Sequence, residues 1–305
     1  MVRQSALEGI ANFKKPEHIY AFVENLSIFE WLQKVERINL GSVYEGIINF
    51  ILTENRDYVH KNFISFEEKS RLLLAKSISS SANANLNDVR LLLNDTHFLI
   101  RNLAIDHFDK LSQKEINNLL DDKSSKVRLN LLHKLQSQSD FCGLVHSFLA
   151  DDSTSIREFA RYCLKDEITD FATIYNDNIK ENRKIFGSIC GLGETDGKQF
   201  SGNVERFLHG GTIKIRKAAF LALTKLDEKT AYEFAIANLD GEYAGVRNLA
   251  IRFLQKKVNI EVVERARDIY KNGSLDLKKA MLKLFSDIGG WATISDILIG
   301  TIDEN

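Results

Sequence analysis

The stretch that determines the fold runs from Leu208 to Lys257 and reads LHGGTIKIRKAAFLALTKLDEKTAYEFAIANLDGEYAGVRNLAIRFLQKK. It contains one pattern twice: an apolar residue followed by Arg, an alanine three positions after the Arg, and a leucine seven positions after it. A fixed period of about 20 to 50 residues is typical of stacked-repeat proteins, so the stretch predicts a repeat architecture. The matched positions, 31 residues apart, are Leu208 and Leu239, Ile215 and Val246, Arg216 and Arg247, Ala219 and Ala250, and Leu223 and Leu254.

Further copies of the pattern occur upstream, and each predicts a helix. The apolar–Arg pair recurs at Ile100-Arg101, Val127-Arg128 and Ile156-Arg157, while Arg71 and Leu277-Lys278 begin weaker copies. Steps of three and seven residues stay on one face of a helix, which is expected to be buried. The predicted buried positions are Leu74, Ala104, Leu131, Ala160, Ala219, Ala250 and Met281, and then Ile78, Phe108, Leu135, Leu164, Leu223, Leu254 and Phe285.

The repeats predict an all-α solenoid of about eight antiparallel helix pairs. Residues 1–65 are expected to form a divergent helical cap, and residues 66–305 to form repeats continuous with it in a single domain. Arg157 and Arg216 are 59 residues apart, so one irregular unit is expected to begin near Arg183. Its apolar stripe would be Ile185, Ile189 and Leu192, and the glycine-rich segment 191–197 is predicted to be the turn that ends it.

The repeated unit resembles HEAT repeats. The resemblance rests on the pattern Leu-x-Asp-(x)n-Val/Ile-Arg-x-x-Ala-x-x-x-Leu and covers roughly residues 66 to 300. The segments 191–197 (GLGETDG) and 285–290 (FSDIGG) look like the short-period variety found in phycobilin lyases. The resemblance to HEAT repeats implies a right-handed superhelix of helix pairs. In such a superhelix the second helix of each pair lines a concave, partner-binding surface.

Acidic residues accompany the repeated arginines. Asp95, Asp122 and Asp151 each precede their Arg by six residues, and Asp240 precedes Arg247 by seven. This separation is too long for a pair within one helix. Each Asp is therefore expected in a turn between helices, bonded to an Arg of its own or an adjacent unit. The predicted ladder consists of Asp95, Arg101, Asp122, Arg128, Asp151, Arg157, Arg216, Asp240 and Arg247.

Composition restricts the functional classes. A net charge of −1 gives no general attraction to nucleic acid or anionic lipid. Three widely spaced cysteines favour a reducing compartment over a disulfide framework. No stretch approaches the roughly 20 apolar residues of a membrane helix. We therefore expect a cytoplasmic protein without a membrane partner.

No motif indicates catalysis, and neither a metal nor a cofactor is expected. The seven histidines form no HExxH motif, and His107 is expected to be a core residue. The segment 193–199 (GETDGKQ) lacks the spacing of a phosphate loop. HEAT-like glycosylases that release alkylated bases use a basic groove with tryptophans and a catalytic Asp. Because Trp31 and Trp291 are near opposite ends of the chain, a DNA-binding protein or alkylpurine-type glycosylase is the alternative, not the first choice.

The outward positions of the second helices provide the remaining candidate surface. They change from acidic in the early units to basic in the later ones and include a tyrosine and two leucines. Arg and Tyr are favoured anchors of protein interfaces. We therefore expect a non-catalytic scaffold that binds a protein or peptide partner at His133, Arg161, Tyr162, Lys165, Lys217 and Arg252.

Overall fold

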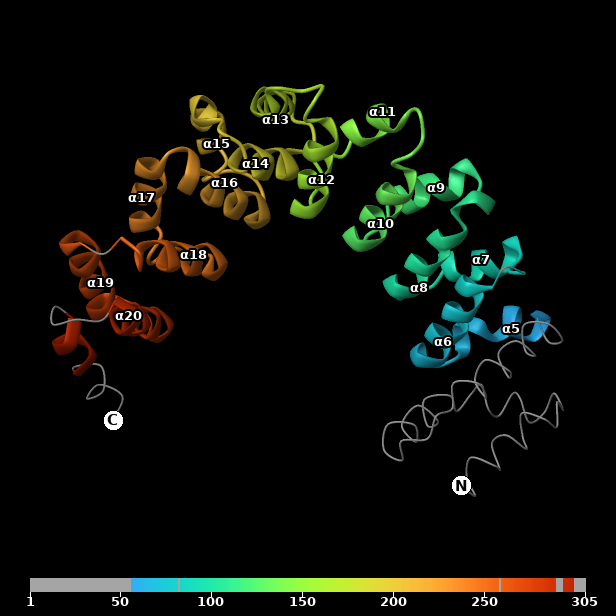
Figure 1. The fold of residues 1–305 in the computed structure, drawn as a ribbon. Helices are drawn as coiled ribbons and strands as arrows, with labels where there is room; N and C mark the ends of the chain where they lie inside the picture. Colours follow the sequence, from blue (N-terminus) through green and yellow to red (C-terminus); the bar gives the residue numbers. More distant parts are fainter. Residues whose placement is uncertain (1–55, 82, 258, 289–292, 299–305) are drawn as a thin grey trace, which may run out of the picture. The chain divides into compact units, whose positions relative to one another are not determined.

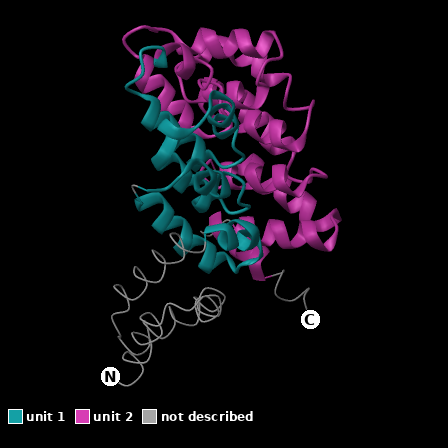
Figure 2. Cartoon of the chain, turned by 90° about the vertical axis from the view of Figure 1, so that its right-hand side faces the viewer, with its two compact units in different colours: residues 1–141 teal, residues 142–305 magenta. Residues whose placement is uncertain are grey.

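The computed structural model describes residues 56–81, 83–257, 259–288 and 293–298. Every regular element within these ranges is a helix (Figure 1). The chain divides into two compact units, residues 1–141 and 142–305 (Figure 2). Most of the expected N-terminal cap, up to residue 55, lies outside the described residues, and so do Trp31 and Trp291. In the described part of the chain, no helix is both long and apolar enough to span a membrane.

Unit 1 consists of short helices that each pack on the next helix or on the one after it. Helix α6 contacts both α7 and α8, and α10 contacts both α8 and α9. Two of these helices begin at a side chain that accepts a backbone N–H, Asn85 before α7 and Ser112 before α9, each in a complete capping box. The elements are α5 (Arg56–Asn62), η1 (Phe63–Ser65), α6 (Glu68–Ser80), α7 (Leu86–Leu93), α8 (Phe98–Leu103), η2 (Ala104–Lys110), α9 (Gln113–Leu120) and α10 (Ser125–Leu135); α11 (Phe141–His146) begins at the last residue of the unit.

In unit 2 each helix likewise packs on the next helix or on the one after it, and most of the helices are longer. Helices α12, α14, α16 and α18 form a row in which each contacts the next, while α13 packs on α14, α17 packs on α16 and α18, and α19 packs on α20. The row is visible in Figure 1. The elements are α12 (Thr154–Leu164), α13 (Phe171–Lys180), α14 (Ile185–Gly193), η3 (Lys198–Phe200), α15 (Ser201–Glu205), α16 (Ile213–Leu226), α17 (Glu228–Ala237), α18 (Ala244–Leu254), α19 (Ile260–Asn272) and α20 (Leu275–Ile288).

The core follows the predicted positions, with one exception. All seven residues three positions after the basic residue are buried, and so are six of the seven that follow four residues later. The exception is Phe108, which is only half-buried. Helix α8 ends at Leu103 and continues as the 3₁₀ helix η2, in which His107 has non-helical angles (φ −114°, ψ 30°). This change of period turns Ile105 and His107 inward instead.

Helix α14 contains glycines that were predicted to form a turn. Gly191 and Gly193 lie in its last turn, and the chain reverses only after Glu194. The glycines permit close packing, because a Cβ atom on Gly191 would overlap the Tyr175 ring and one on Gly193 would lie 2.8 Å from the Ala222 Cα. At the start of the helix, a Cβ on Gly187 would overlap the backbone carbonyl of Ala150. Glycine here indicates close helix contact, and the predicted stripe residues Ile189 and Leu192 are fully buried.

Candidate partner-binding surface

Three arginines make the same two-sided contact, which we call the arginine clamp. In each, Nη1 donates to a backbone carbonyl just before the arginine's own helix, while Nε and Nη2 donate to a carboxylate further along the chain. Arg71 bonds Phe66 O at 2.7 Å and Asp95 Oδ2 at 2.7 Å. Arg101 bonds Asp95 O at 2.9 Å and Asp122 Oδ2 at 2.6 Å. The clamp therefore ties each helix to its own preceding turn and to the next unit.

Arg157 makes the third clamp with a different acid. Its Nη1 donates to Asp151 O at 2.7 Å, and its Nε and Nη2 donate to Glu194, which follows α14. Glu194 also accepts a hydrogen bond from Arg161 Nη1 at 2.9 Å, and the same Nη1 lies 2.9 Å from the Tyr175 hydroxyl oxygen. Burial alone would raise the pKa of Glu194, but the two guanidinium groups hold that pKa below its usual value. Two cations thus share one recessed carboxylate.

The clamp aspartates also order the turn in which they lie. Asp95, Asp122 and Asp151 each accept the backbone N–H two residues on, at 2.7 to 2.8 Å. They precede the N-cap residue by two positions, so they shape the turn and do not cap the helix itself. Burial would raise the pKa of Asp122, but hydrogen bonds from Arg101 and the Ser124 N–H hold that pKa below its usual value. Arg128 donates from Nη1 to Asp122 O at 2.6 Å.

The clamp lacks its acid at Arg216 and Arg247. Arg247 donates from Nη1 to Gly241 O at 2.9 Å, as the other clamp arginines donate to their carbonyls. Within the described chain, however, the buried Nε atoms of Arg216 and Arg247 have no hydrogen-bond partner. Asp240, expected in the ladder, is bonded instead to Arg265 Nη2 of α19 at 2.9 Å. Gly241 stands where earlier units have Asp, and the Arg216 guanidinium lies 5.0 Å from the Tyr243 ring.

The residues predicted to bind a partner occupy two different units. His133 is exposed on α10 of unit 1. The other five lie on α12, α16 and α18 of unit 2 or directly after α12. Arg161 is largely committed to the Glu194 cluster, whereas Tyr162 is 64% exposed. Lys165 lies with Nζ 4.6 Å from the Tyr162 ring centre.

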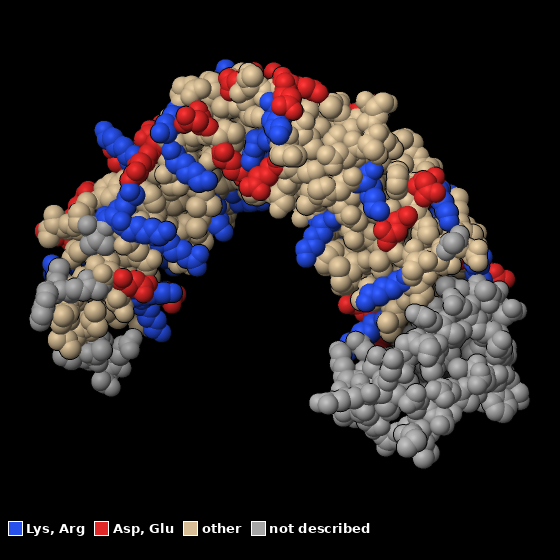
Figure 3. All heavy atoms as spheres, in the orientation of Figure 1, with Lys and Arg blue, Asp and Glu red and all other residues tan. Residues whose placement is uncertain are grey.

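A cationic surface, which we call the basic face, consists of Lys217, Leu221 and Lys225 on α16, Arg252 on α18, and Lys256, which follows the end of α18. Lys217, Leu221 and Lys225 follow one another at four-residue steps, so they share one side of α16. Leu221 is 49% exposed. Residues 213–226 and 244–257 together contain eight Lys or Arg and no Asp or Glu. Lys and Arg side chains gather over these helices in Figure 3.

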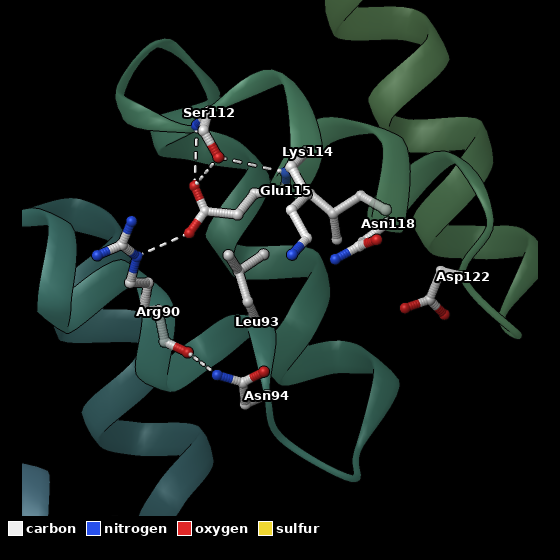
Figure 4. Close-up of a pocket in the computed structure, with 9 residues that line it drawn as sticks. Arg90, Leu93, Asn94, Ser112, Lys114, Glu115, Asn118 and Asp122 are labelled. Atoms are coloured by element: carbon white, nitrogen blue, oxygen red, sulfur yellow. Dashed lines mark hydrogen bonds and ion pairs between the residues drawn. The ribbon is translucent and has the colours of Figure 1, made fainter.

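A pocket of about 490 Å³ lies between α7 and α9 in unit 1 (Figure 4). Glu115 accepts hydrogen bonds from the Ser112 hydroxyl at 2.6 Å, the Ser112 N–H at 2.9 Å and Arg90 Nε at 2.7 Å. Hydrogen bonds from Ser112 and then Arg90 lower the pKa of Glu115 to about 2. The other lining carboxylate, Asp122, belongs to the Arg101 clamp. Both acids are therefore held ionised by structural partners, and neither is suited to proton transfer near neutral pH.

A second pocket, of about 660 Å³, lies in unit 2 beside the start of α14. Asn182 (φ 56°) ends α13 in a Schellman motif, with Arg183 N–H bonded to Asn178 O at 2.8 Å. Lys184 (φ 41°) anchors its Nζ on Ser147 O at 2.6 Å. The positive φ values thus accompany helix-end contacts. The pocket is lined by His146, Ser147, Leu149, Ala150, Ile174, Asp177, Asn178, Arg183 and Lys184.

The remaining reactive side chains have structural surroundings. His107 is buried and lies 3.0 Å from Ile78 O, as predicted for a core histidine. Burial raises the thiol pKa of Cys163 and Cys190, so both favour the unreactive thiol. Among the described residues, no three His, Cys, Asp or Glu side chains are grouped to hold a metal ion. A scan against protein-family models and a search of curated proteins found no match to this chain.

Proposed function

We propose that the chain is a non-catalytic helical-repeat scaffold that binds a protein or peptide partner along the second helices of its repeats. In this proposal the helix pairs stack as a right-handed HEAT-like superhelix of about eight pairs, of the short-period kind found in phycobilin lyases. The recurring clamp supports the repeat assignment, because Arg71 and Arg101 fasten successive helices in the same way. The three free cysteines fit a cytoplasmic location.

The observation that carries the binding proposal is the basic face. The exposed Leu221 lies between Lys217 and Lys225 along α16, and the same row of helices presents Tyr162. Interfaces combine apolar and aromatic anchors with charged groups that give specificity. Because α16 and α18 pack directly on each other, the face is already ordered before a partner arrives. Less side-chain and loop freedom is then lost on binding.

DNA binding is the second candidate, because the same acid-free cationic stretch would attract any polyanion. Phosphate neutralisation supplies most of the affinity of non-specific DNA binding and makes that affinity fall with salt. A HEAT-like alkylpurine glycosylase would in addition release a base. Binding of a DNA duplex at physiological salt, together with release of an alkylated base, would favour this candidate over the scaffold.

Charge reversal on the basic face tests the proposal. We expect the double variant Lys217→Glu, Arg252→Glu to lose at least about tenfold of partner affinity, because like charges then face the partner. The partner would be identified by quantitative affinity purification from the native cell, and its affinity then measured with purified components at two salt concentrations. Surface substitutions of this kind usually alter stability little, so the melting temperature should stay close to that of the wild type.

A matched control places the same charge change on the outer helices. Lys229 on α17 and Lys271 on α19 are both exposed, so the variant Lys229→Glu, Lys271→Glu should retain the partner. Equal partner recovery by all three proteins would contradict the proposed face. If the control variant loses the partner as well, the loss reflects the changed net charge of the protein. That result would also contradict the proposed binding face.

A further inference from the structure

The incomplete clamp at Arg247 keeps the carbonyl contact of the complete ones, whereas the Arg216 guanidinium lies over the Tyr243 ring. In the Arg71 and Arg101 clamps, the carboxylate comes from the turn before the next helix of the row, at Asp95 before α8 and Asp122 before α10. The turn before α18 has Gly241 at this position. Only Gly273 and Ser274 connect α19 to α20, and neither is an acid. Neither Arg216 nor Arg247 therefore has an acid at the position of Asp95 and Asp122 in the next turn. Asp240, beside Gly241, is bonded to Arg265, and Glu242 is exposed.

An unoccupied guanidinium edge is energetically unfavourable. A buried N–H without a partner forfeits the hydrogen bond it would make with water, and both Nε atoms are in this condition. Arg247 keeps the clamp orientation through its bond to Gly241 O. Each Nε is buried, but both arginine side chains are exposed in part, so an incoming group would reach the guanidinium from its exposed side. A carboxylate would form the paired, charge-assisted hydrogen bonds that suit a guanidinium.

We propose that the partner supplies these missing acids: an extended acidic segment of a protein places one Asp or Glu side chain on Arg216 and the next on Arg247. The inference rests on the proposed function and names the chemistry of the partner. The side chain of Lys217 lies along the start of α18, because its Nζ is 3.8 Å from the Cβ position of Gly245. The partner's acids would thus meet Lys217 as well as the two guanidinium groups.

The packing of the helices sets the spacing of the acids. Helices in direct contact have axes roughly 8–10 Å apart, and α16 and α18 are in contact. An extended chain in the polyproline II conformation advances about 3.1 Å per residue with three residues per turn, so side chains three residues apart lie on the same side. Acids three residues apart, in an acid-x-x-acid pattern, therefore match successive clamps. Protein is favoured over nucleic acid because every complete clamp of this chain holds a carboxylate, and because exposed Leu221 offers an apolar contact.

Selection from a displayed library of random 12-residue peptides on the immobilised full chain tests the inference. We expect retained peptides to be enriched in Asp or Glu at a spacing of three. One such peptide is then titrated against Arg247→Gln, which removes one guanidinium, and Lys271→Gln, which removes a cation from α19. The first variant should bind the peptide about tenfold more weakly, as expected for loss of a charge-assisted pair, and the second should bind like the wild type.

The variant Gly241→Asp tests the inference from the opposite direction, by supplying the acid within the chain. The backbone at Gly241 has no positive φ, and a Cβ there would lie 3.0 Å from Asn238 Oδ1 and 3.2 Å from the Asn238 backbone O, so the turn must shift by a few tenths of an ångström. The new carboxylate should occupy Arg216 as Asp122 occupies Arg101. We expect roughly tenfold weaker peptide binding without a lower melting temperature.

The outcomes separate the inference from the proposed function. Wild-type binding by both Arg247→Gln and Gly241→Asp would overturn the inference, and the scaffold proposal would stand if Lys217→Glu, Arg252→Glu still lost the partner. Retained peptides without the acidic spacing would also overturn it. Tight binding of a 20-base-pair DNA duplex that no peptide displaces would assign the arginines to phosphate. Failure to retain any peptide, with no partner lost by the charge-reversed variant, would overturn both.

Discussion

Replacing Glu194 by alanine is expected to destabilise unit 2 by about 3–5 kcal/mol, the usual result of removing one partner from a buried charge pair. Arg157 is only 1% exposed, and Glu194 is the one acid that its Nε and Nη2 contact. The same substitution removes the partner of Arg161, which also bonds the buried Tyr175. Urea unfolding of the full chain, followed by circular dichroism, measures the change.

An exposed pair provides the control for this prediction. Arg265 and Asp240 are 36% and 39% exposed, so Asp240→Ala should cost no more than about 1 kcal/mol. If Glu194→Ala unfolds at the same urea concentration as Asp240→Ala, the Glu194 cluster contributes no more than a surface pair.

The pH dependence of the Glu194 contribution has a definite sign. Because the folded-state pKa of Glu194 lies below its usual value, its ionised form stabilises the fold. That stabilisation is complete above the unfolded pKa, about 4.3 for glutamate, and is lost as the pH falls through the lower folded pKa. The stability difference between wild type and Glu194→Ala should therefore be constant at neutral pH and decrease in strongly acidic buffer.

Replacing Gly187 by alanine is expected to prevent α14 from packing in its present position. The added Cβ would overlap the carbonyl of Ala150, a backbone group that cannot move aside by changing a rotamer. Overpacking of this kind typically costs about 1–3 kcal/mol and occasionally more, and a backbone contact is at the upper end. The thermal unfolding midpoint of the full chain should fall by several degrees.

The matched control is Gly202→Ala in α15, where an added Cβ would meet nothing within 4 Å. Alanine is favoured over glycine in a helix by up to about 1 kcal/mol, so this variant should be at least as stable as the wild type. Equal midpoints for Gly187→Ala and Gly202→Ala would show that α14 does not approach Ala150 this closely.

The helices and their buried faces could be predicted from the sequence because burial repeats with the helical period. Leu131, Ala160 and Leu223 are fully or almost fully buried for this reason. The α-helical period wrongly predicted that Phe108 is fully buried, because the 3₁₀ segment there has a different number of residues per turn. The glycines of α14 led to the wrong prediction of a turn, because glycine occurs both in turns and where helices pack closely. Only the residues packed against a glycine show which of these two roles it has.

The candidate site was predictable in its residue types but not in its pairings. The spacing of the sequence identified the Asp and Arg positions. It did not show that each clamp arginine bonds both a backbone carbonyl and a carboxylate. The backbone carbonyls have no sequence signal. Glu194 stands 37 residues after Arg157, outside the repeat spacing, so no pattern linked them. Gly241 became informative only after the complete clamps showed which group is missing there.

The acid of each complete arginine clamp lies further along the chain than its arginine, so a complete clamp adds a charged link between neighbouring helices. The joint between α12 and α14 is locked by the Arg157 clamp, whereas the joint between α16 and α18 has packing but no such lock. An acidic ligand on Arg216 would add a charged link at the joint between α16 and α18. Binding of that ligand would therefore reduce the motion of these helices relative to each other.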